Sequence, residues 1–220
     1  MASIVVYLGS SSSLALEALD LLPSSSFYNS VVSYSSGELV YLERVEPEFI
    51  KDVCIRPSKS SNMLLAGDHL CVFTDSVQKS GVYSNLFICT LSELGRSALY
   101  TSSPPRASSK NPRAILALYV KKLLSSGASL EKLAAKLATS SGGRGVVISP
   151  IPYSSSSYGV VFGVDNSAYL CIKYTDSGIL ARLSTVVDQR YRCYSGKVFV
   201  FRLLSGGIIR VESRSMESVY

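Results

Sequence analysis

The stretch Arg190-Tyr-Arg-Cys-Tyr-Ser-Gly-Lys197 combines cations with tyrosines. Guanidinium groups bind phosphates through two parallel hydrogen bonds, and tyrosine rings stack on unpaired bases. The pattern therefore predicts a nucleic-acid-binding segment that uses Arg190, Tyr191, Arg192, Tyr194 and Lys197. Cations at the C-terminal end of a helix, where they complement its dipole, would give the same pattern. The sequence leaves both interpretations open.

Basic residues gather in the second half of the chain. The net charge is +6, and between Arg106 and Arg144 eight basic residues accompany one acid, Glu131. Most acids lie in the first hundred residues. A phosphate backbone is therefore expected to meet the second half of the chain. Arg144 and Arg182 join the residues that we predict to bind nucleic acid.

A glycine–serine loop near the N-terminus could bind phosphate. Gly9 and the serines at 10–13 follow a strand-like run and precede a helix-like one. Backbone N–H groups at a helix start bind anions. The loop lacks the lysine of a phosphate loop and the later glycines of a dinucleotide-binding motif. A strand–turn–helix connection capped by serine is the favoured interpretation.

Other candidates for catalysis lack the neighbours that the chemistry needs. His69 is the only histidine, and a catalytic triad or a zinc site needs a nucleophile or more ligands beside it. Asp165 and Lys173 flank a strand, as in metal-dependent nucleases, but Cys171 stands where a second carboxylate is needed. We therefore predict no catalytic residue, no metal and no cofactor, and expect no catalytic activity from the chain alone.

The predicted elements indicate an α/β (α+β) protein in two parts. Residues 1–100 form the predicted β-rich N-terminal domain, and residues 101–112, rich in proline and serine, the predicted linker. Within the first part we expect a helix at 14–22 and strands at 3–8, 38–45, 53–55, 69–73 and 85–91.

Residues 113–220 form the predicted α/β C-terminal domain, with a helical hairpin, a mixed sheet, one helix and a closing hairpin. Pro112 suits a first helical turn, and Ser129 can cap a second helix over 130–138. Glycines and Pro150 follow, which favours an αα-hairpin over a helix-turn-helix. We expect strands at 146–149, 160–164 and 168–174, a helix at 176–187, and paired strands at 197–204 and 208–213.

Composition bears on the cellular compartment. The five cysteines are widely spaced, lie mostly in apolar runs and form no Cys-x-x-Cys pair. We interpret them as buried free thiols in a reducing, cytoplasmic environment. A pair could still form, as in intracellular proteins of hyperthermophiles. Eighteen consecutive apolar residues occur nowhere, so we predict no membrane span.

The C-terminal half resembles the archaeal tRNA-splicing endonucleases. The matching residues are Leu180-Ala-Arg-Leu-Ser184, Lys197-Val-Phe-Val-Phe, Gly206-Gly207 and Ile208-Ile-Arg-Val-Glu212, with Gly9-Ser10 and Phe27-Tyr28 in the N-terminal half. The family cleaves RNA without metal, using a tyrosine, a histidine and a lysine. Lys197 would match the lysine, whereas no histidine stands near Ser157-Tyr158-Gly159. The resemblance therefore implies the structural, non-catalytic subunit of such an enzyme.

These observations favour a non-catalytic, nucleic-acid-associated subunit with a protein partner and with RNA or DNA bound to its basic half. The closing hairpin would pair with the partner by β-augmentation. The alternative is a DNA-binding transcriptional regulator whose N-terminal half senses a ligand. An enzyme that uses the Gly9 loop on a phosphorylated substrate is the third hypothesis.

Overall fold

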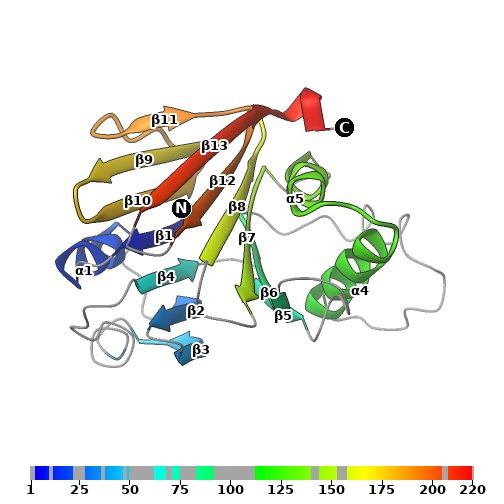
Figure 1. The fold of residues 1–220 in the computed structure, drawn as a ribbon, viewed down its shortest axis with the longest axis horizontal. Helices are drawn as coiled ribbons and strands as arrows, with labels where there is room; N and C mark the ends of the chain where they lie inside the picture. The colour runs from blue at the N-terminus through cyan, green and yellow to red at the C-terminus, as the bar shows by residue number, and fades with distance from the viewer. Residues whose placement is uncertain are drawn as a thin grey trace.

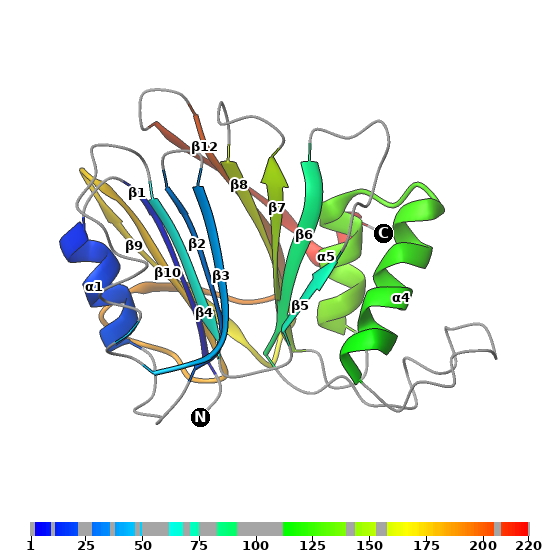
Figure 2. The same cartoon turned by 90° about the horizontal axis from the view of Figure 1, so that it is seen from below.

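The computed structural model describes residues 3–9, 12–21, 28–35, 38–46, 49, 62–67, 71–74, 83–91, 112–139, 144–152, 158–204 and 208–219. In this part of the chain, two antiparallel sheets lie face to face with helices on both outer sides (Figure 1, Figure 2). The layers follow the order helix, sheet, sheet, helices. The predicted mixed α+β class is confirmed.

Sheet A is seven-stranded and carries the chain's N-terminal strand near its middle. Helix α1 (Ser12–Asp20) covers its outer face. Its strands are, in spatial order, β11 (Arg192–Tyr194), β9 (Tyr169–Thr175), β10 (Gly178–Ser184), β1 (Ser3–Gly9), β4 (Asn62–Gly67), β2 (Tyr28–Ser35) and β3 (Glu38–Val45).

Sheet B is six-stranded, and the helices α4 (Pro112–Ser125) and α5 (Leu130–Thr139) cover its outer face. The short 3-10 helix η1 (Met216–Val219) follows its last strand. Its strands are, in spatial order, β13 (Ile209–Ser215), β12 (Lys197–Leu203), β8 (Tyr158–Val164), β7 (Gly145–Pro152), β6 (Tyr83–Thr90) and β5 (Cys71–Thr74).

The main core lies between the two sheets. Successive strand residues face opposite sides, and on β1 the residues Ile4, Val6 and Leu8 join a cluster with Phe162 and Phe201 of sheet B. A second cluster fills the space between sheet B and its helices. Burial of these large apolar side chains is the main force that holds the sheets together.

The predicted helical hairpin is confirmed. Helix α4 begins at Pro112, and the backbone N–H of Lys132 donates to Ser129 Oγ at 3.2 Å, which caps α5. The chain then enters β7 rather than a third helix, as the glycines after α5 indicate.

The helix predicted at 176–187 is wrong, because residues 178–184 form β10. β10 lies between β9 and β1 and is buried on both faces. A strand buried on both faces is apolar at nearly every position, and its sequence also fits a helical spacing. The predicted mixed sheet is wrong too, since every described strand pairing is antiparallel.

Each sheet contains strands from both of the predicted domains, residues 1–100 and residues 113–220. β1 pairs with β10, and β6 pairs with β7. The other predicted strands lie within or overlap described strands, except 53–55, which lies outside the described residues, as does the predicted linker up to residue 111. β2, β4 and β11 were not predicted.

The interpretation of the cysteines as free thiols is wrong for three of them. Cys171 on β9 and Cys193 on β11 are opposite each other in the sheet and form a disulfide. Cys89 on β6 is also disulfide-bonded, and Cys71 on β5 stands opposite it. Cys54 lies outside the described residues. The prediction failed because sequence spacing does not reveal which strands become neighbours.

Candidate nucleic-acid interface

The predicted nucleic-acid-binding residues near the edge of sheet A lie on two opposite faces of that sheet. β11 is the edge strand, and its residues Arg192 and Tyr194 pair with Ile172 and Leu170 of β9. Paired residues share a face of a sheet, and both β9 residues belong to the core between the sheets. Arg192 and Tyr194 therefore face the inner side, whereas Cys193 faces the outer side.

On the inner side, the strand positions and contacts bring together two tyrosines and two cations, Tyr174, Arg192, Tyr194 and Lys197, which we call the tyrosine–cation patch. Lys197 Nζ lies 5.7 Å from the centroid of the Tyr194 ring, a cation–π distance. The Tyr194 ring in turn lies 5.4 Å from that of Phe199. The patch thus rests against the core.

Tyr174 was missed by the sequence analysis, although it belongs to this patch. Its side chain is 51% exposed. Partial desolvation is the main cause that raises the pKa of Tyr174, the charge of Tyr194 raises it further, and the positive charge of Arg192 lowers it. The alternation of Leu170, Ile172 and Tyr174 along one strand face is the signal that could have identified it.

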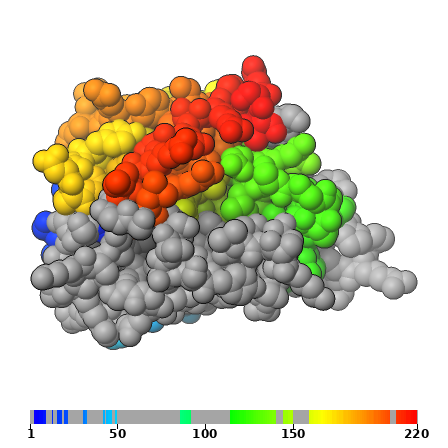
Figure 3. Space-filling model, in the orientation of Figure 1, coloured from blue at the N-terminus to red at the C-terminus, as the bar shows by residue number. Residues whose placement is uncertain are grey.

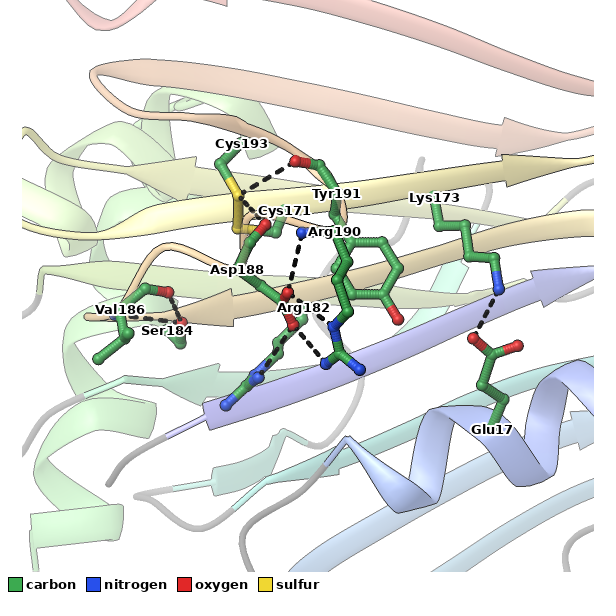
Figure 4. Close-up of polar contacts among 10 residues, drawn as sticks. All are labelled: Glu17, Cys171, Lys173, Arg182, Ser184, Val186, Asp188, Arg190, Tyr191 and Cys193. Carbon is green, nitrogen blue, oxygen red and sulfur yellow. Dashed lines mark hydrogen bonds and ion pairs between the residues drawn. A yellow bond between two sulfur atoms is a disulfide. The ribbon is translucent and has the colours of Figure 1, made fainter.

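On the outer side, Arg182 and Arg190 converge on Asp188 (Figure 4). Arg190 donates to the Asp188 carboxylate from Nε at 3.0 Å and from Nη2 at 2.8 Å. Arg182 Nη1 lies 3.6 Å from the same carboxylate. The hydrogen bond from Arg190 is the main reason that the pKa of Asp188 is lowered. We call Arg182, Asp188 and Arg190 the Asp188 cluster.

Tyr191 and Lys173 flank this cluster on the same face. The Arg190 guanidinium lies 5.5 Å from the centroid of the Tyr191 ring. Lys173 Nζ donates to Glu17 of α1 at 2.6 Å, and this hydrogen bond raises the pKa of Lys173. Each cation here has a carboxylate beside it, so the three cations and two carboxylates leave a net charge of only +1 on this group of residues.

Arg144 lies at the end of sheet B. Its carbonyl accepts a hydrogen bond from the backbone N–H of Asp165 at 2.9 Å. Gly145 and Lys197 both pair with Val164, from opposite sides. Adjacent strands are about 4.8 Å apart, so the backbones at Gly145 and Lys197 are separated by about 10 Å. Arg144, which is exposed, is thus close to the patch but outside it.

The nuclease-like combination of Asp165 and Lys173 does not form. The Asp165 carboxylate accepts hydrogen bonds from the N–H and hydroxyl of Ser167, both at 2.8 Å, whereas Lys173 binds Glu17. Among the described residues, no three His, Cys, Asp or Glu side chains are grouped to hold a metal. His69 lies outside that set.

Gly9 has a packing role in the structure. A Cβ atom on Gly9 would lie 2.3 Å from the Ser177 carbonyl oxygen and 2.7 Å from the Tyr7 hydroxyl. Only glycine permits such a close approach of two chain segments. The serines at 10 and 11, which would complete the phosphate loop, lie outside the described residues.

No helix among the described residues is long and apolar enough to cross a bilayer. No protein-family model and no curated protein sequence matches the chain.

Among solved structures, the chain is similar to glutamine phosphoribosylpyrophosphate amidotransferase from B. subtilis in complex with ADP and GMP. The TM-score is 0.58 at 12% sequence identity. The match covers 98% of this chain and 49% of the amidotransferase chain. This chain therefore spans about half the length of that protein. At this level of identity the likeness concerns the fold.

Proposed function

We propose that this chain is a non-catalytic, nucleic-acid-associated subunit that binds single-stranded RNA at the tyrosine–cation patch. The observation that carries the proposal is the grouping of Tyr174, Arg192 and Tyr194, on the inner face of sheet A at its β11 end, with Lys197 of β12 in sheet B. Tyrosine rings bind bases by stacking, and the neighbouring cations bind the phosphates between them.

The patch is a better candidate than the Asp188 cluster because its cations keep their charge available. Within the part of the chain that the structure describes, Arg192 and Lys197 form no ion pair. The Arg190 guanidinium, in contrast, already binds a carboxylate with two of its N–H groups. A phosphate would have to compete with Asp188 for it.

The test is the affinity for a fluorescent single-stranded RNA, measured by anisotropy. The double variant Tyr174→Ala/Tyr194→Ala should weaken binding, since each stacked base contributes about 1–3 kcal/mol. Arg192→Gln/Lys197→Gln should weaken binding and reduce the slope of log K against log salt by about 0.7 for each lost phosphate contact.

Lys121→Gln is the matched control. Lys121 is exposed on α4, on the far side of sheet B, so its loss removes one charge without touching the patch. Its affinity should equal that of the wild type. Equal losses in the control and the patch variants would contradict the proposal, and so would a wild-type protein that does not bind RNA. A preference for duplex DNA would instead favour the transcriptional regulator.

The more specific hypothesis of a tRNA-splicing subunit needs its own test. Its Leu180-Ala-Arg-Leu-Ser184 stretch was expected on a helix and lies on β10. We propose that a protein partner binds this chain in the cytoplasm. Disulfides are compatible with that compartment in hyperthermophiles. Purification of the native complex, with identification of bound protein and RNA, tests the partner and the hypothesis together.

A second candidate function follows from the fold match across nearly the whole chain. The matched protein is a glutamine amidotransferase, so this chain is a candidate for a domain that binds or cleaves a carboxamide. The test is release of ammonia from glutamine. A rate above that of buffer would support this function, and no release together with RNA binding would support the first proposal.

A further inference from the structure

Strand β13 ends sheet B, and its outer edge pairs with none of the strands that the structure describes. It contributes seven residues, more than the edge strands β11 and β5, which contribute three and four, and one fewer than β3 at the far edge of sheet A. Among the described strands, β12 is its sole neighbour. Figure 3 shows the red C-terminal segment at the molecular surface. Such an edge offers free backbone N–H and C=O groups to another strand.

The side chains of β13 alternate between two kinds of surface. Ile209 and Val211 pack against the core between the sheets. Arg210, Glu212 and Arg214 face the opposite side, in register with Arg202, Val200 and Val198 of β12. Along this side the charges therefore run plus, minus, plus.

We propose that a second copy of this chain pairs with β13 antiparallel, about a two-fold axis at Val211. In this register Arg210 is opposite the partner's Glu212, and Glu212 is opposite the partner's Arg210. Val211 meets the partner's Val211 on the core side. Directly opposite unlike charges stabilise a strand pair, and the symmetry produces the contact twice. The two six-stranded sheets become one continuous sheet.

Alternative registers are less favourable. A shift of the pairing register by one residue would place the charged side of one copy next to the apolar side of the other. An axis at Glu212 would oppose two glutamates, and Arg210 would face the partner's Arg214. An axis at Ser213 would pair Glu212 with the partner's Arg214, but its core-side pairs would be Ser213 with Ser213 and Val211 with Ser215, which bury less apolar surface than Val211 against Val211.

Glu212 is already placed between cations. Its Oε1 lies 3.1 Å from Arg210 Nε and 3.7 Å from Arg202 Nη1. The partner's Arg210 would add a third cation beside the Glu212 carboxylate, whose side chain is 30% exposed. Ile208, which is 64% exposed, would be partly buried at the end of the interface. The surface that the pairing buries is therefore partly apolar.

The test is the mass of the protein in solution, measured by sedimentation equilibrium over micromolar concentrations. The wild type should be a dimer. Arg210→Glu places two like-charge pairs at the interface and should raise the dimer Kd by about tenfold or more. The double variant Arg210→Glu/Glu212→Arg exchanges the charges within each pair and should restore dimerisation.

Arg214→Glu is the matched control, because Arg214 faces the partner's Ile208 in this register, and it should leave the dimer intact. Circular dichroism verifies that each variant is folded. A monomeric wild type would overturn the proposal. So would an Arg210→Glu protein that dimerises normally, a double variant that stays monomeric, or dissociation by Arg214→Glu, which the Ser213 axis predicts.

Discussion

Replacement of Asp188 by Asn should destabilise the fold by about 2 kcal/mol. The Asp188 side chain is 11% exposed and binds both guanidiniums of its cluster. Asparagine keeps the shape and removes the charge. Arg182, whose side chain is 19% exposed, then lacks its carboxylate partner. A lost hydrogen bond or ion pair to a charged group in such a setting costs about 1.5–3 kcal/mol. Arg190 is exposed, so solvent screens its contribution.

Urea unfolding at pH 7 measures this difference in stability. Arg190→Gln is the comparison, since it removes only the exposed partner, whose contribution solvent screens, and it should cost less stability than Asp188→Asn. The lowered pKa of Asp188 adds a pH dependence. Its stabilisation is complete above the ordinary pKa of 3.8 and is lost as the pH falls through the lower folded value.

The wild type should therefore lose its advantage over Asp188→Asn as the pH falls below about 3.8. An Asp188→Asn protein as stable as the wild type at pH 7 would refute this account of the cluster. So would a stability difference that is the same at pH 7 and at pH 3.

Three further predictions concern the fold. Cys171→Ser/Cys193→Ser opens a link between residues 22 apart and should cost about 3 kcal/mol in urea unfolding; an unchanged midpoint would contradict it. Gly163→Ala places a Cβ 2.3 Å from the Ala134 carbonyl oxygen, so a loss of about 2 kcal/mol or more is expected, and calorimetry that shows an unchanged Tm would refute the contact. Ser129→Ala removes the α5 cap and should cost about 1 kcal/mol, measured by thermal unfolding, with wild-type stability as the contrary result.

Local signals in the sequence predicted the helical hairpin correctly. Pro112 can begin a helix because its missing N–H is not needed there, and the Ser129 side chain satisfies a free N–H of the next helix. Neither signal depends on distant parts of the chain. The error at β10 has the opposite cause. Its neighbours, β1 and β9, bury both of its faces, so Ile179 to Leu183 show no polar alternation.

The candidate site could be predicted only in part, for the same reason. The Arg190–Lys197 stretch was identified as basic and aromatic, but its division between two sheet faces depends on β11 pairing with β9. That pairing also placed Tyr174 diagonally across from Arg192 on the face that carries Tyr194, and Cys171 against Cys193. The hydrogen bonds between Arg190 and Asp188 form in the turn that precedes β11. The sequence analysis expected a helix up to residue 187 and therefore did not predict this turn.

Ultraviolet cross-linking of the wild-type protein to single-stranded RNA, with the adducts located by mass spectrometry, tests the central claim most directly. Stacked bases react with the rings that they contact, so the account predicts adducts at Tyr174 or Tyr194, on the tyrosine–cation patch. Adducts confined to Tyr119 on α4, or no adducts at concentrations where RNA binds, would contradict it.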